Sequence, residues 1–219
     1  MDSISSPSDL HGHYDLVIVG AGPAGLGAAN HPSTAGLRVL TVDAGKSVDR
    51  RERDNPDDLT CGDGGAGLFS DGKFSFFPSS TALWSLDDSE SLRAGYRWTA
   101  KVLSDCGMEV PPFPDSPPSA EEPAGQWFLK RYPSEYLTLE QRIDLIRGLV
   151  ESGHGDILRQ AMVEEGDYSF DTRLFTLSIS GRKVTADRVI FAGGRFGPRL
   201  MDRFPFMEPV FRRLEVGFR

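Results

Sequence analysis

The sequence predicts an α/β fold whose core is a parallel β-sheet, and three observations support this prediction. Continuous apolar runs at Tyr14–Val19 and Leu37–Asp43 are typical of strands that are buried on both faces of a parallel sheet. A glycine-rich turn and a helix-like segment separate them, and together they match the length of about 30 residues that a βαβ unit needs. A further apolar run at Arg188–Ala192 ends in Gly193 and Gly194, as a buried strand ends at a tight turn.

The N-terminal part begins with a polar segment and continues into the βαβ unit. Residues 1–12 are rich in serine, so we expect a disordered tail. The strand at 14–19 is followed by a helix over Pro23–Ala35, which has small residues on the face that approaches the sheet, and then by the strand at 37–43. Residues 44–80 are dense in glycine and aspartate and are predicted to form loops.

The middle of the chain is predicted to be an insertion of a different character. Apolar anchors favour a helix within Thr81–Cys106, and the acidic run Asp87–Glu90 is typical of a helix start. Residues 110–133 are dense in proline, which favours an irregular excursion. Thr138–Ser152 is the clearest amphipathic helix, and Thr138 is its predicted cap.

The C-terminal part is predicted to return to the sheet. Residues 156–163 are expected to form a third central strand. Arg173–Ser180 and Arg182–Thr185 are expected to form a hairpin that turns at Ser180 and Gly181, before the buried strand at 188–192.

These elements predict one domain that carries an insertion. Residues 13–80 and 150–219 form the predicted domain, and residues 81–149 form the inserted helical and proline-rich segment. Residues 212–219 have the pattern of another strand, with no cap or polar tail after it. We therefore expect that the chain ends inside a domain, either as a fragment or as one subunit of a split protein.

Composition and charge exclude several classes of function. The net charge is −8 and the Lys and Arg residues form no cluster, so no nucleic-acid partner is expected. No apolar run approaches the roughly 20 residues that a membrane span needs, and no signal peptide is recognisable, so a cytoplasmic protein is expected. Cys61 and Cys106 lack the spacing of a zinc site, so no metal is expected.

The glycine-rich turn after the first strand has the GxGxxG spacing of a dinucleotide-binding turn. Gly20 permits the tight turn, Gly22 lets a pyrophosphate approach the backbone, and Gly25 lets the helix pack on the strand. The N-terminus of the following helix would favour the phosphates. The predicted cofactor-binding residues in this turn are Gly20, Ala21, Gly22, Pro23, Ala24 and Gly25.

Asp43 ends the second strand of the βαβ unit, where a carboxylate can bind the hydroxyls of an adenosine ribose. A carboxylate would repel a 2′-phosphate, so Asp43 favours an unphosphorylated ribose. We also expect Ala44 and Val163 to contact the cofactor.

Flavin and nicotinamide cofactors share this fingerprint, and a second segment favours flavin. Residues 185–194 (TADRVIFAGG) resemble the second FAD signature of the glutathione-reductase-like class, in which a hairpin leads into a strand that ends in Ala-Thr-Gly beside the cofactor. In this sequence Gly193 replaces the threonine. The predicted cofactor-binding residues here are Ala192, Gly193, Gly194 and Arg195.

A third segment, Gly64–Lys73, reads GGAGLFSDGK and has four aromatic residues in it or just after it. It resembles a motif of a family of FAD-dependent dehydrogenases, in which the pattern is Gly-Gly-Ala-Gly-x-Phe-Ser-Asp-Gly-Lys. Consecutive N–H groups in such a loop can form a nest for an anion. The predicted cofactor-binding residues here are Gly64, Gly65, Ala66, Phe69, Ser70, Asp71, Gly72 and Lys73.

The resemblance implies a Rossmann-like FAD-binding domain of the three-layer ββα type, with a parallel sheet, a β-meander and an inserted segment on the substrate side. It implies that the 64–73 loop wraps FAD from the pyrophosphate to the flavin. Lys73 is then a possible electrostatic partner of the flavin, and Asp71 anchors Lys73 or the ribityl chain. No catalytic acid or base is nominated, because the flavin itself performs the chemistry.

Three functions fit these observations. The first is an FAD-dependent oxidoreductase, or the FAD-binding half of one, that acts on a small-molecule substrate by hydride transfer to or from the flavin. The second is a non-catalytic FAD-binding subunit of a split, heteromeric flavoenzyme. The third is an NAD-dependent dehydrogenase. Because members of the resembling family are longer than this chain, we expect a partner subunit or a second copy to complete the flavin site.

Overall fold

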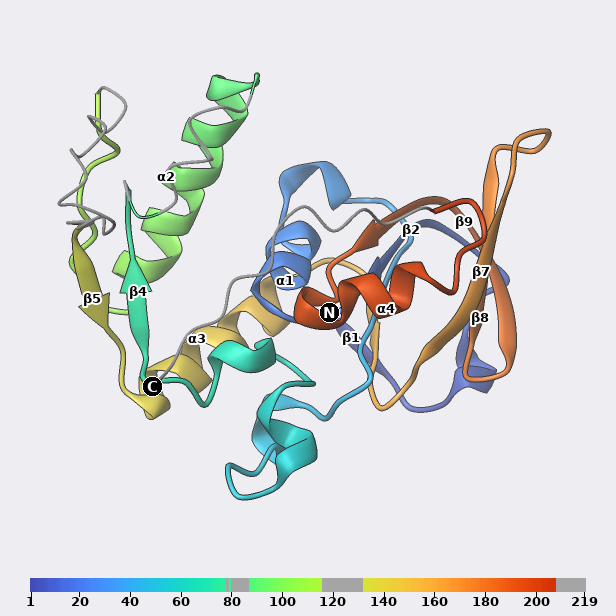
Figure 1. Cartoon of the computed structure of the whole chain (residues 1–219), viewed down its shortest axis with the longest axis horizontal. Coiled ribbons are helices and arrows are strands. Elements are labelled where there is room, and N and C mark those ends of the chain that lie inside the picture. Colours follow the sequence, from blue (N-terminus) through green and yellow to red (C-terminus); the bar gives the residue numbers. More distant parts are fainter. Residues whose placement is uncertain (78, 80–86, 116–131, 208–219) are drawn as a thin grey trace, which may run out of the picture. The chain divides into compact units, whose positions relative to one another are not determined.

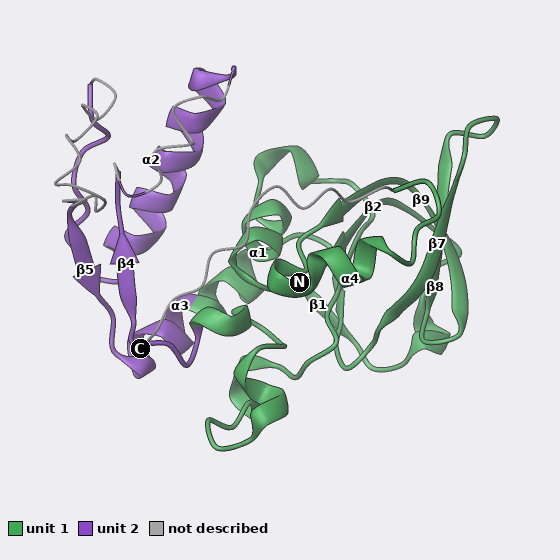
Figure 2. Ribbon diagram, viewed as in Figure 1, with its two compact units in different colours: residues 1–67, 146–219 green, residues 68–145 purple. Residues whose placement is uncertain are grey.

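A computed structural model describes residues 1–77, 79, 87–115 and 132–207 of the chain (Figure 1). The chain divides into two compact units (Figure 2). Unit 1 comprises residues 1–67 and 146–219, and unit 2 comprises residues 68–145. The units divide at Leu68, inside the Gly64–Lys73 motif, and at Ile146, whereas the predicted insertion spans residues 81–149.

Unit 1 contains a seven-stranded sheet with the order β1-β6-β3-β2-β9-β8-β7. The first five strands in this order are parallel, and β8 and β7 continue the sheet in antiparallel fashion. The α/β fold class predicted from the sequence is thereby confirmed. The strands are β1 (Asp2–Ile4), β2 (His13–Val19), β3 (Val39–Val42), β6 (Asp156–Leu158), β7 (Val163–Ser169), β8 (Leu174–Ile179) and β9 (Arg182–Phe191).

The predicted βαβ unit is β2, α1 (Pro23–Ala29) and β3. The helix is shorter than the sequence pattern suggested. Pro32 has no N–H group to continue the helical hydrogen bonds, and the chain instead forms a 3₁₀ turn at Pro32–Thr34.

Alternate residues of the central strands face two different layers. Val17 and Val19 of β2 belong to a core that also contains Leu177, Ile179 and Val184 of the β7-β8-β9 meander. The intervening side chains of β2 and β3 pack against Ala29 of α1. One face of the parallel strands thus shares a core with the meander and the other packs against α1, and β9 joins the meander to the parallel strands within one sheet.

Residues 1–12 differ from the disordered tail that we predicted. Residues 2–4 form β1, which pairs in parallel with β6 at the edge of the sheet. Leu10 is only 3% exposed and lies in the main core. A three-residue edge strand is held by backbone hydrogen bonds, so its polar sequence carries no periodic signal.

The strand predicted at 156–163 is two strands, β6 and β7. Gln160 has φ 53 and turns the chain between them, which an apolar pattern cannot foresee. The predicted hairpin turn is confirmed, because Ser180 and Gly181 both have positive φ and connect β8 to β9. The two predicted strands after that turn are one continuous strand, β9.

Unit 2 contains a two-stranded ribbon of β4 (Lys73–Ser75) and β5 (Ser134–Tyr136), which the sequence did not predict. It also contains α2 (Ser89–Asp105), which Asp88 caps through the Ser91 N–H group. The helix α3 (Leu139–Ser152) begins at the predicted cap, where Thr138 and Gln141 bond to each other's backbone N–H groups.

Two sequence predictions lie outside the described residues. These are the strand at 212–219 and most of the proline-rich excursion, at 116–131. Within the described part of the chain, no helix combines the length and apolar character of a membrane span.

A short helix, α4 (Gly197–Met201), follows β9 in unit 1, after a 3₁₀ turn at Gly194–Phe196.

Candidate functional site

The turn between β2 and α1 is fixed by backbone packing. Gly20 has φ 112, and a Cβ atom there would lie 2.5 Å from the carbonyl oxygen of Ala192, at the end of β9. A Cβ atom at Gly25 would overlap the carbonyl oxygen of Gly20. The turn therefore requires glycine at both positions, which gives a physical reason for two of the three glycines in the motif.

Asp43 connects three segments of unit 1. Its carboxylate is 9% exposed and accepts hydrogen bonds from the N–H groups of Ala21 (2.7 Å), Gly45 (2.8 Å) and Gly62 (2.7 Å). Because an ionised carboxylate offers about four acceptor positions, about one position is left for a ligand hydroxyl. Asp43 thus ties the first glycine turn to a second glycine-rich segment, Gly62–Gly67.

The second segment is held by a buried arginine. Arg51 is 7% exposed and donates to the carbonyl oxygens of Asp58, Asp63 and Gly65, with its Nη2 atom 2.9 Å from the Gly65 oxygen. Burial lowers the pKa of its guanidinium. Arg51 thus binds two carbonyl groups of the segment, those of Asp63 and Gly65.

Two ion pairs lie in the same loop region, one within the second segment and one before it. Asp63, 1% exposed, pairs with Arg159 at 2.9 Å, and Asp58 pairs with Lys46 at 2.8 Å. The hydrogen bond from Lys46 lowers the pKa of Asp58. These residues were not predicted from the sequence, because charged side chains in a loop predicted to be solvated give no signal of burial.

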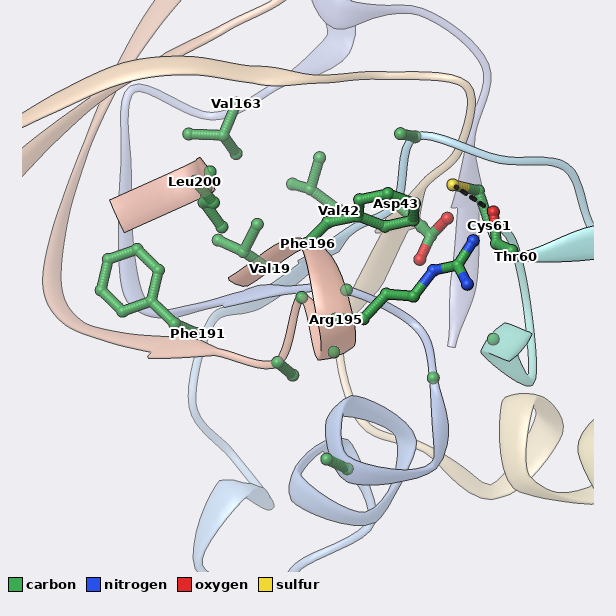
Figure 3. A pocket seen from close by; sticks show the side chains of 18 of the residues that line it. Val19, Val42, Asp43, Thr60, Cys61, Val163, Phe191, Arg195, Phe196 and Leu200 are labelled. Carbon is green, nitrogen blue, oxygen red and sulfur yellow. Dashed lines mark hydrogen bonds between the residues drawn. The ribbon is translucent and has the colours of Figure 1, made fainter. Parts of the chain in front are cut away.

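A cavity of 670 Å³ lies within unit 1 where these segments meet (Figure 3). This volume falls within the range of about 300–1,000 Å³ that small-molecule sites occupy. It lies at the carboxyl ends of β2, β3 and β9, where parallel sheets place their ligands.

Most of the predicted cofactor-binding residues line this cavity. They are Gly20, Gly22, Pro23, Ala24, Asp43, Ala44, Gly65, Ala66, Val163, Ala192, Gly193, Gly194 and Arg195. Ala21, Gly25 and Gly64 do not line it but shape its walls through the contacts of the two glycine segments. Their binding of a cofactor stays a prediction.

The cavity also has lining residues that the sequence analysis did not name as binding residues. Thr60 and Cys61 precede the second glycine segment, and Met162 is 50% exposed beside Val163. Arg199 and Arg203 extend from α4 and the turn that follows it. Arg199 and Arg203 follow Arg195 at spacings of four and eight residues, which are visible in the sequence, but that spacing acquires meaning only from the 3₁₀ turn and α4 that the segment forms.

The second half of the Gly64–Lys73 motif belongs to unit 2, so Phe69, Ser70, Asp71, Gly72 and Lys73 are described apart from the cavity. Buried Arg142 donates to the carbonyl oxygen of Ser70 at 3.0 Å. Asp71 accepts from the backbone N–H of Lys73, and the Lys73 ammonium lies 5.1 Å from the centre of the Tyr132 ring.

No family model matches the chain. Two curated proteins, each named as an opine oxidase subunit, match it over 40 residues. The protein of Agrobacterium tumefaciens (strain Ach5) is 48% identical, and that of Rhizobium meliloti is 52% identical. The matched stretch is 18% of this chain and only 8% of either relative, so the match spans a small part of their length.

Three of the solved structures that resemble this chain show the extent of the similarity. OTEMO in complex with FAD and NADP is 16% identical, with a TM-score of 0.43 over 83% of this chain and 25% of its own. An oxidized steroid monooxygenase bound to NADP is 16% identical, with a TM-score of 0.44 over 83% of this chain and 26% of the monooxygenase. NikD, described as an unusual amino acid oxidase, is 15% identical, with a TM-score of 0.47 over 88% of this chain and 54% of NikD.

Proposed function

We propose that this chain is the FAD-binding part of an oxidoreductase that acts on a small molecule by hydride transfer to or from the flavin. The observation that carries the proposal is the composition of one cavity. Two glycine-rich segments, the Asp43 carboxylate and the glycine-rich end of β9 all line it. A dinucleotide needs these features at the carboxyl end of a parallel sheet.

The residues present fit the parts of FAD. A Cβ atom at Gly22 would meet only the Gly65 Cα atom, at 3.8 Å, so bare backbone faces the space for a pyrophosphate. Asp43 keeps about one acceptor position for a ribose hydroxyl. Ala161, whose N–H donates to the Asp43 carbonyl, and Val163 line the cavity as a wall suited to adenine.

FAD would supply the two-electron chemistry when bound, and the residues of this chain would bind and orient it. Lys73 is proposed as an electrostatic partner of the flavin. We expect Lys73→Ala to lower the reduction potential of the bound flavin, because a nearby cation stabilises the anionic reduced form. An unchanged potential and unchanged FAD affinity would remove Lys73 from this role.

The chain is also proposed to work with a partner subunit or a second copy of itself. The 40-residue match to two proteins that are named as oxidase subunits supports this arrangement. It favours the alternative in which the chain binds FAD but does not catalyse alone. Activity of the isolated chain with a reducing substrate would refute that alternative.

The test of FAD binding is a visible absorption spectrum of the purified chain, followed by mass identification of the cofactor that denaturation releases. We expect a flavin spectrum and the mass of FAD. If the chain purifies without a cofactor, titration with FAD, FMN and NAD replaces the spectrum, and FAD is expected to bind most tightly. Binding of NAD in preference to FAD, or of none of the three, would contradict the proposal.

Gly22→Ala is the sharpest variant for this test. The added methyl group has room in the free protein, since its nearest neighbour lies at 3.8 Å, but it occupies space that we assign to the pyrophosphate. We expect unchanged stability and FAD affinity reduced by at least about tenfold. Gly148→Ala, at an exposed position of α3 with open space around it, is the matched control.

A further inference from the structure

Three arginines form one face of the segment that follows β9. Arg195, Arg199 and Arg203 are spaced four residues apart: Arg195 lies in the 3₁₀ turn Gly194–Phe196, Arg199 in α4, and Arg203 in the turn after α4, where its N–H donates to the Leu200 oxygen. Residues at this spacing share one side of a helix. All three are exposed and line the cavity, and we call them the arginine face.

The arginine face leaves the cavity with an excess of positive charge. Asp43 is the one acidic side chain among the described residues that line the cavity, against three arginines. Its oxygens already accept three backbone N–H groups. Within the described part of the chain, none of the three arginines forms an ion pair. The whole chain carries a charge of −8, so this local excess is opposite to the overall charge.

The three guanidinium groups have different contacts with the protein. Arg203 donates to the Val163 carbonyl oxygen at 3.1 Å, and Arg195 lies 5.0 Å from the centre of the Phe196 ring. Figure 3 shows the Arg195 side chain extending into the cavity. Among the described residues, Arg199 is therefore the least constrained of the three, and its substitution disturbs the fold least.

We propose that the arginine face binds the phosphate groups of the nucleotide, so that the cavity selects its ligand by those phosphates. Arginine bonds to phosphate oxygens in a bidentate manner and keeps its charge. Three cationic groups on one cavity wall suit a ligand with more than one anionic group better than a single carboxylate. This inference deepens the proposed function, on which it rests, by assigning residues to the pyrophosphate.

The experiment is isothermal titration calorimetry of the whole chain with adenosine, AMP, ADP and FAD. We expect wild-type affinity to rise from adenosine to ADP. For Arg199→Gln and Arg195→Gln, ADP and FAD affinities should each fall by about tenfold, because one charge-assisted hydrogen-bonding group is lost. Adenosine affinity should not change. Added salt should weaken ADP binding more in the wild type than in the double variant.

The matched control is Arg188→Gln, an exposed arginine of β9 that does not line the cavity. It should leave all four affinities unchanged, and Arg199→Lys should retain part of the ADP affinity. Equal losses for adenosine and ADP would show an effect through folding and overturn the inference, as would unchanged ADP affinity or a wild type that binds neither. A chain that binds ADP through these arginines but binds no FAD would refute the proposed function and leave this inference standing.

Discussion

The two glycine-rich segments, Gly20–Gly25 and Gly62–Gly67, line the same cavity but are held in different ways. In the first segment, Gly20 and Gly25 are packed against backbone carbonyl groups that leave no room for a side chain. In the second segment, the carbonyl groups are bound by the buried side chain of Arg51, and Asp63 is paired with Arg159.

Two similar glycine-rich loops can therefore differ in which changes destabilise them. The first segment depends on the absence of side chains, so pH and salt should affect it little. The second depends on buried charges whose partners must all be present. Asp43 joins the two, since it accepts from both Ala21 and Gly62.

The largest effect is expected from Gly25→Ala, which tests the steric side of the comparison. The added Cβ atom would overlap the Gly20 carbonyl oxygen, so α1 must move away from the sheet. We expect a loss of about 3 kcal/mol in the free energy of unfolding, measured by urea denaturation, together with loss of FAD binding. Gly148→Ala should instead leave stability unchanged or raise it by up to about 1 kcal/mol. Equal effects of the two substitutions would contradict the steric account.

Arg51→Met tests the electrostatic side. It leaves three carbonyl groups without this donor, those of buried Asp58 and Asp63 and of half-buried Gly65, and we expect it to cost about 2–3 kcal/mol in the free energy of unfolding. The exposed Arg53→Met should cost less than about 0.5 kcal/mol. Arg51→Lys should recover only part of the loss, because an ammonium cannot reproduce the planar fork. Full recovery with lysine would show that charge alone, without this geometry, holds the segment.

Asp43→Asn tests the link between the segments. The asparagine keeps one acceptor oxygen but places an NH₂ group against one of the backbone donors. We expect a loss of about 2 kcal/mol in the free energy of unfolding, with a weaker FAD affinity. If stability falls and FAD affinity does not, Asp43 acts only as a structural tie, and its proposed contact with the ribose is wrong.

The smallest effect is expected from pH, and it should act on the loop that precedes the second segment, through Asp58. The Lys46 hydrogen bond lowers the pKa of Asp58, so the folded protein binds fewer protons there than the unfolded chain. This contribution to stability is present above about pH 4 and is lost as the pH falls through the folded-state pKa. Lys46→Met should reduce the loss of stability between pH 7 and pH 3 in thermal unfolding. Lys101→Met, which breaks an exposed pair with Asp105, is the control and should not change it.

The part of the fold that sequence patterns predicted is the part that local physics determines. The apolar runs of β2 and β3 are buried on both faces, and the glycine spacing follows from contacts within a few residues. The Thr138 cap and the Ser180–Gly181 turn are likewise local. These elements could be predicted because the interactions that form them join residues that are close together in the sequence.

The missed elements depend on contacts between distant parts of the chain. β4 pairs with β5 across about sixty residues, and β1 is held by its pairing with β6. In the sequence Arg51 does not differ from an exposed arginine of a loop, and its role follows from its burial and its hydrogen bonds in the folded chain. At the site, the glycines and Asp43 were recognisable from spacing, whereas Arg199 and Arg203 became recognisable only once the helical turns after β9 were known.

The most direct test of the central claim, that FAD occupies the cavity of unit 1, is a comparison of cysteine alkylation rates. Cys61 lines the cavity, and Cys106, in unit 2, is the internal control. Rates with iodoacetamide are measured by mass spectrometry of peptides, with and without saturating FAD. We predict that FAD slows alkylation of Cys61 by at least about tenfold and leaves Cys106 unchanged. An unchanged rate at Cys61, while FAD is demonstrably bound, would place the cofactor elsewhere and contradict the account.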